Sequence, residues 1–240
     1  MDLDFYSDVV EREGNRLLEA AAGDLAAPVA ACPGWDVARL VGHVGQVHGW
    51  IAATVRSAST EPPRHGSPDL PEPADTLGWG RDQLVGLVDA LRNAQTGTPT
   101  WTWAEPRVVD FFHRRMAHET LVHRYDVEHA VGELTPIDPD LAADGVDELI
   151  FVGLQSSANP DKQFSYPSGS LHLHRTDGDG EWLLRVDDGS LVATREHAKG
   201  DVAVRGAAAD LLLYLWGRGG QNLEVFGDPL LAEAWSNAAP

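Results

Sequence analysis

The residues best placed for chemistry are a glutamate and a histidine four positions apart in a strongly helical segment. Glu119 and His123 emerge from the same helix face about one turn apart, so both side chains can reach one ion. The stripe that contains them runs Phe112, Met116, Glu119, His123, Val127 and Ala130. It is apolar except in its middle, and a buried carboxylate needs a partner. The pattern indicates a divalent-metal site.

A second helical segment offers the third ligand of such a site. His43 falls among apolar neighbours, where an unpaired imidazole would be costly. Two histidines and a glutamate on facing helices are typical of a catalytic metal site with open coordination positions. Two alternatives remain at this point. His48, on an adjacent stripe, could replace His43, and a glutamate and histidine four apart also occur as a mild helix-stabilising pair.

Several other polar residues are weaker candidates for a metal-binding or catalytic role. His118 and His129 step away from the apolar stripe, so we expect both to face solvent. Arg124 and Asp126 lie close in sequence to the two ligands and are candidates to hydrogen-bond them on the side away from the ion. Cys32 is the single cysteine, and no neighbouring cation or histidine in the sequence would lower the pKa of its thiol. We therefore do not expect Cys32 to be a nucleophile.

The elements that must position these residues are helices. Apolar residues repeat at helical intervals over the first two thirds of the chain. They predict helices at about Leu3 to Ala22, Val37 to Ala58, Thr76 to Gln95 and Arg107 to Val131. Five prolines between Ser57 and Asp75 indicate a surface loop, and the loop from Thr96 to Pro106 carries Trp101 and Trp103. Helices in series with two long connections predict a four-helix bundle.

The periodicity changes in the last third of the chain. Asp138 and Pro139 begin a further helix that extends to about Leu154. Apolar alternation from Leu171 onward then predicts an antiparallel meander of short strands, with His172 and His174 on its solvent face. Two short helices complete this part, at Ala207 to Trp216 and Leu230 to Trp235.

These elements predict an α+β protein with two domains. We expect a metal-binding four-helix bundle over residues 1–157 and a small domain of antiparallel sheet and helices over residues 158–240.

Composition and charge limit the function. The chain has 18 lysines and arginines against 37 aspartates and glutamates, a net charge of −19 that disfavours nucleic acids and anionic membranes. A single cysteine excludes an intramolecular disulfide framework. The N-terminus is acidic and no apolar run follows it, so we expect no signal peptide and no membrane span. These features predict a cytoplasmic protein.

Two motifs carry a resemblance that runs nearly end to end. The segment PGWDVARLVGH, which ends at His43, and the segment RRMAHETLVHRYD, which contains Glu119 and His123, resemble the mycothiol-dependent maleylpyruvate isomerase family of actinobacteria. The resemblance implies a DinB-like bundle and zinc, or another divalent metal, bound by these three residues. It thereby favours His43 over His48. The segment GAAADLLLYLWGR is similar to the C-terminal domain of that family and implies that Arg218 serves the active cleft.

The resemblance also implies the chemistry. Zinc would lower the pKa of the thiol of mycothiol, and the thiolate would either isomerise a small anionic electrophile such as maleylpyruvate or stay attached to it. Arg218 would bind a substrate carboxylate, and we expect Trp101 and Trp103 to line the mouth of the cleft. The alternatives are metal-assisted hydrolysis and a noncatalytic metal-binding module. The expected partners are therefore small molecules, and the expected state is a monomer or homodimer.

Overall fold

The computed structural model describes residues 1–72, 75–154, 166–220 and 222–238. The chain divides into two compact units, Met1–Thr135 and Pro136–Pro240, and each is described by itself. The predicted domain boundary, between residues 157 and 158, lies outside the described residues. The second unit already begins before the predicted boundary, because the helix after Asp138 packs against a later helix of the same unit.

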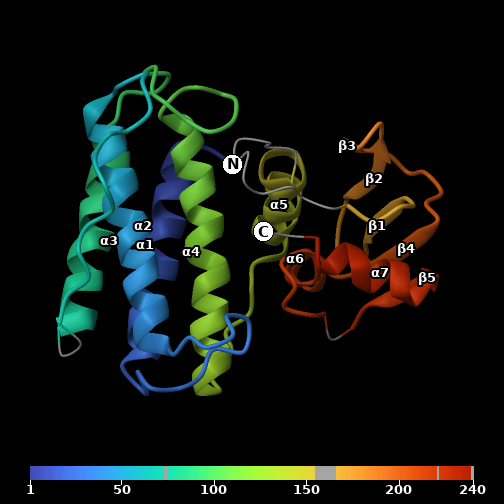
Figure 1. Cartoon of the computed structure of the whole chain (residues 1–240), viewed down its shortest axis with the longest axis horizontal. Coiled ribbons are helices and arrows are strands. Elements are labelled where there is room, and N and C mark those ends of the chain that lie inside the picture. The colour runs from blue at the N-terminus through green and yellow to red at the C-terminus, as the bar shows by residue number, and fades with distance from the viewer. Residues whose placement is uncertain (73–74, 155–165, 221, 239–240) are drawn as a thin grey trace. The chain divides into compact units, whose positions relative to one another are not determined.

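The first unit is a four-helix bundle (Figure 1), as the sequence predicts. Its helices are α1 (Leu3–Ala21), α2 (Val37–Ser57), α3 (Thr76–Asn93) and α4 (Asp110–Val131). Each helix packs mainly against two others: α1 against α3 and α4, and α2 against α3 and α4. Aspartate caps fix two of the starts, because Asp2 and Asp36 accept hydrogen bonds from backbone N–H groups in the first turns of α1 and α2.

Helix α4 is buried on more than one face, since it contacts both α1 and α2. One expectation is therefore wrong. His118, predicted to face solvent, has no exposed surface, and its ring lies 6.3 Å from that of Tyr6 on α1. His129, near the C-terminal end of α4, is exposed as predicted. The stripe through Glu119 and His123 is thus one of several buried stripes on this helix.

The second unit combines short helices with one sheet (Figure 1) and confirms the α+β class. Its helices are α5 (Pro139–Glu148), the π-helix η2 (Leu149–Leu154), α6 (Ala208–Leu215) and α7 (Pro229–Ser236). Its strands are β1 (Leu171–Arg175), β2 (Glu181–Asp187), β3 (Ser190–Thr194), β4 (Val202–Gly206) and β5 (Glu224–Gly227). Among the described residues, the strands follow the order β3-β2-β1-β4-β5.

The sheet is mixed, which corrects the prediction of an antiparallel meander. Strand β4 pairs with β1 and runs parallel to it, whereas the other pairs are antiparallel. Strand β3 lies at one edge of the sheet. The next strand, β4, does not pair with β3 but pairs with β1, on the side of β1 away from β2. Residues 195–201 make this crossing. Strand β5 was not predicted, because all four of its residues are exposed and no apolar alternation marks it.

The two faces of the sheet differ sharply. One face buries Leu171 and Leu173 of β1, and helix α6 contacts β1 and β4 in this region. The side chains between them, His172 and His174, occupy the opposite face, as the alternation predicts, but the expected solvent exposure is wrong for His172, which is only 7% exposed. No helix in the described part of the chain is long and apolar enough to cross a membrane.

Candidate metal centre

Three side chains of the bundle converge on one point between α2 and α4. His43 comes from α2, and Glu119 and His123 come from α4. Glu119 Oε1 lies 3.8 Å from His43 Nε2 and 3.2 Å from His123 Nε2. Ligand atoms of all three residues lie within 4.8 Å of one another. The helical spacing of Glu119 and His123 is what places them on the same side of α4.

A buried arginine holds the other oxygen of the Glu119 carboxylate. Arg115, one turn earlier on α4, donates from Nη2 to Glu119 Oε2 at 2.8 Å. Burial alone would raise the pKa of the Glu119 carboxyl, but the imidazoles of His123 and His43 and the charge of Arg115 hold this pKa well below its usual range. Glu119 is therefore ionised, with Oε1 directed toward the two histidines.

An aspartate orients the second histidine. His123 Nδ1 lies 3.0 Å from Asp126 Oδ2, so this nitrogen donates its hydrogen to the carboxylate. Burial would lower the pKa of the His123 imidazole, but Asp126 and Glu119 raise it to about 9. A proton and a metal ion therefore compete for Nε2 of His123.

The turn before α2 supplies a wall beside His43. Gly34 has a φ of +82°, a left-handed conformation that glycine adopts without strain, and the turn closes through a Trp35 N–H bond to the Cys32 carbonyl. The Trp35 ring then lies edge to face with His43 at 5.3 Å between centroids. The Arg39 guanidinium lies 4.6 Å from the centre of the same indole ring.

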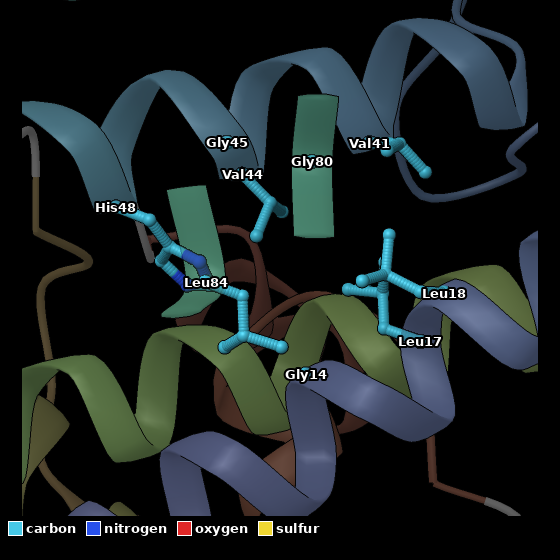
Figure 2. A pocket seen from close by; sticks show the side chains of 9 residues that line it. All are labelled: Gly14, Leu17, Leu18, Val41, Val44, Gly45, His48, Gly80 and Leu84. Carbon is cyan, nitrogen blue, oxygen red and sulfur yellow. The ribbon is translucent and has the colours of Figure 1, made fainter. Parts of the chain in front are cut away.

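His48, the alternative ligand, lies away from this point. It is only 2% exposed, and its Nε2 is 2.9 Å from Thr120 Oγ1. Figure 2 shows its ring at the edge of a small apolar cavity of about 10 Å³, among side chains from α1, α2 and α3. Burial lowers the pKa of His48 to about 4, so the imidazole is neutral and belongs to the packing of the bundle.

Of the two flanking charges, only Asp126 touches a candidate ligand. Arg124 is fully buried on another side of α4. Its Nε donates to Glu13 Oε2 on α1 at 2.8 Å, and its Nη1 donates to Glu128 Oε2 at 2.7 Å. The Arg124 side chain therefore connects two helices of the bundle instead of supporting His123.

The tryptophans proposed for the cleft mouth are half-buried in the loop between α3 and α4. The Trp101 ring lies 5.9 Å from that of Trp50 on α2, and the Trp103 ring lies 4.9 Å from that of Phe111 on α4. These contacts hold the loop against the bundle in which the three converging side chains lie.

Arg218 belongs to the second unit, directly after α6. Gly217 has a φ of +69°, and the Arg218 N–H bonds back to the Leu213 carbonyl at 2.8 Å, which ends the helix in a left-handed turn. Its guanidinium donates from Nη1 to the Trp216 carbonyl at 2.6 Å.

Sequence reasoning missed two residues of this centre, Arg115 and Trp35. Arg115 precedes Glu119 by four positions, which is the same spacing that revealed His123. Trp35 lies eight positions before His43 in the segment PGWDVARLVGH, of which only His43 was predicted to serve the site. The sequence shows both residues, but only the folded bundle shows that they contact Glu119 and His43.

The donor set fits a divalent ion of the zinc class. Two imidazole nitrogens and one carboxylate oxygen form a known three-ligand set for zinc, and such a set leaves a position for water or an incoming ligand. The hydrogen bond from His123 to Asp126 is the outer contact that metal-binding histidines characteristically make.

The chain thus combines a helical bundle, in which two histidines and a glutamate converge, with a unit built on a mixed sheet. Residues 9–128 match the mycothiol maleylpyruvate isomerase N-terminal domain, and residues 140–234 match the C-terminal domain of the same family. The chain belongs to the mycothiol maleylpyruvate isomerase family and is therefore an enzyme.

Two solved structures share the fold. One is the mycothiol-dependent maleylpyruvate isomerase, at 15% identity and a TM-score of 0.65. The other is a histidine-to-alanine mutant of the mycothiol-dependent maleylpyruvate isomerase, at 15% identity and a TM-score of 0.66. Each comparison covers 94% of this chain and 93% of the other. No curated protein matches the sequence.

Proposed function

We propose that the protein is a zinc-dependent enzyme that uses mycothiol as a nucleophile. The substrate would be a small anionic electrophile such as maleylpyruvate, which is either isomerised from cis to trans or joined to the thiol. The observation that carries this proposal is the convergence of His43, Glu119 and His123 within 4.8 Å in a chain of this family.

The residues of the bundle would bind the ion and orient the ligand atoms, with a coordination position left for the thiol. A zinc ion bound by the three residues would lower the pKa of a coordinated thiol and so provide a thiolate near neutral pH. Asp126 keeps the hydrogen of His123 on Nδ1, which leaves the lone pair of Nε2 for the ion. Arg115 holds Oε2 of Glu119, so Oε1 is the oxygen available to the ion.

Arg218 would bind the substrate carboxylate. The guanidinium is charged at every accessible pH and matches a carboxylate with two parallel hydrogen bonds. A protein with a net charge of −19 repels a small anion over most of its surface, so a fixed cation is needed where the anion binds. Trp101 and Trp103 would contact the carrier of the thiol with their half-buried rings.

Replacing Arg218 with alanine is expected to lower kcat/KM about 10- to 100-fold, the range for losing hydrogen bonds to a charged group. Metal content should stay at the parent level, because Arg218 is not a ligand. The measurement pairs steady-state kinetics with added mycothiol and elemental analysis of the same preparation.

The matched control is Cys32→Ala. Cys32 is half-buried, and activity with added mycothiol should survive its loss. Activity that needs no added thiol and disappears in Cys32→Ala would overturn the proposal and make the protein its own nucleophile. Activity that needs no thiol and survives this change would favour metal-assisted hydrolysis instead.

Replacing Asp126 with alanine is expected to weaken metal binding about 10- to 100-fold, since His123 loses the partner that fixes its tautomer. Competition with a metal-binding dye measures the change. Asp89→Ala is the control, because Asp89 lies on α3 with a side chain that is 62% exposed and should leave affinity unchanged. Equal affinity in both variants would exclude an orienting role for Asp126.

A cytoplasmic location is also part of the proposal. The sequence has one cysteine and hence no disulfide framework, and a thiol cofactor acts in reduced form.

A further inference from the structure

The outer face of the sheet in the second unit carries a second cluster of metal-binding side chains. His172 and His174 come from β1, Glu181 from β2, and His197 from the segment after β3. Glu181 Oε2 lies 2.9 Å from His172 Nε2, and Glu181 Oε1 lies 3.2 Å from His174 Nδ1. His197 Nδ1 also contacts Glu181 Oε2. Ligand atoms of the four residues lie within 4.8 Å of one another.

The topology of the sheet brings these residues together. His172 and His174 are two positions apart, so they project from the same face of β1, and the register places Glu181 directly opposite His174. The crossing segment from β3 to β4 supplies His197. Gly200 lets this segment pass close to the strand, because a Cβ there would lie 2.8 Å from the His172 backbone nitrogen.

Three imidazole rings gather around one carboxylate in this cluster. Their centroids lie 5.5 to 6.5 Å apart. A divalent cation would take lone pairs from the three imidazoles and balance the charge of Glu181. The sequence from Pro136 onward contains three histidines, and all of them are in this cluster.

We propose that His172, His174, Glu181 and His197 bind a divalent transition-metal ion of the zinc class. Three imidazole nitrogens and one carboxylate oxygen suit zinc, nickel and cobalt more than magnesium or calcium. Zinc bonds of about 2.0–2.2 Å place tetrahedral ligand atoms about 3.3–3.6 Å apart. The 3.2 Å between His174 and Glu181 is close to that range, whereas the shorter contacts of His172 and His197 with Glu181 are hydrogen bonds that would lengthen when the ion binds.

A cavity beside the cluster gives the ion access, and the position of His197 gives it a structural role. A cavity of about 370 Å³ is lined by His172, His197 and Lys199 and opens beside the cluster. An ion can therefore arrive from solvent without unfolding the sheet. Once bound, it would fasten the crossing segment, through His197, to both β1 and β2. This site is distinct from the centre of the bundle, with which it shares no residue.

Counting bound ions tests the proposal. Metal-free protein is loaded with Zn²⁺, passed through a desalting column and analysed for zinc per chain. The parent should retain two ions and the double variant His174→Ala/His197→Ala one, because the double change leaves only His172 and Glu181 as ligands, fewer than the three that zinc sites use. The matched control is His129→Ala, which removes an exposed histidine of α4 and should retain both ions.

The two sites fail in different ways, so the test separates them. If only the bundle centre binds metal, the parent retains one ion, the double variant also retains one, and the proposal is overturned. If only the sheet cluster binds, the double variant retains none while His123→Ala retains one. The two replaced side chains are 33% and 80% exposed, so the sheet should stay folded in the double variant.

Cobalt supplies an independent readout. In the His123→Ala background, adding Co²⁺ should produce the visible absorption of a tetrahedral complex, and the further changes His174→Ala and His197→Ala should remove it. No absorption in the His123→Ala background, together with unchanged zinc content in the His174→Ala/His197→Ala variant, would mean that the cluster is only a hydrogen-bonded group.

Discussion

Replacing His123 with alanine is expected to abolish metal binding by the bundle while the helices stay folded. Two ligands, His43 and Glu119, would remain, and zinc centres of this kind use three protein ligands. The bundle has many apolar contacts that do not involve this side chain. Titration with Zn²⁺ should show one fewer bound equivalent than the parent, and activity with mycothiol should fall below detection. Circular dichroism should show unchanged helix content.

The same change at His48 is the decisive comparison. His48 is buried and hydrogen-bonded to Thr120, so His48→Ala removes core volume and should lower stability, yet the zinc equivalent should be retained. Loss of zinc from the His48 variant, with zinc retained in the His123 variant, would show that the ligand assignment is wrong.

Replacing Arg124 with methionine is expected to destabilise the bundle by about 3–5 kcal/mol, the cost of breaking a buried ion pair from one side. The Arg124 side chain is fully buried between Glu13 and Glu128, which are 2% and 3% exposed. Without it, two carboxylates remain buried without their shared cation. Chemical denaturation followed by the helical signal measures the loss.

Arg92→Met is the matched control. Arg92 also pairs with two carboxylates, those of Asp8 and Glu11, but all three side chains are at least 42% exposed. Exposed pairs of this kind contribute about 0–1 kcal/mol. Equal losses in the two arginine variants would mean that burial does not decide the strength of the Arg124 network.

The helix boundaries could be predicted from the sequence because apolar periodicity and capping residues depend on neighbouring positions in the chain. Each bundle helix begins and ends within a few residues of its prediction, and Asp36 marks the start of α2 by capping it. The spacing of Glu119 and His123 is also local, and the structure brings both side chains together with His43. That these three hold a metal ion stays a prediction.

Features that depend on distant partners did not follow from the sequence. Periodicity predicts one buried face, whereas α4 buries several. His118 was therefore predicted to face solvent and Arg124 to support the ligands, although both are fully buried elsewhere on the helix. Alternation places His172 and His174 on the outer face of β1 but does not reveal that a crossing segment brings His197 to them. The parallel pairing of β4 likewise depends on that segment, whose sequence resembles any exposed loop.

The parallel pairing of β1 and β4 has a consequence for the order of folding. Strands β1, β2 and β3 are joined by short turns, so these hairpins can form quickly from contacts close in sequence. Strand β4 pairs with residues about 30 positions earlier, Leu171 with Val202, and this longer loop closes at a higher entropic cost. We expect β4 to dock after these hairpins, and His197 of the crossing segment to reach His172 and His174 only in that step. The second unit would then become able to hold an ion late in folding, after most of its backbone is already in place.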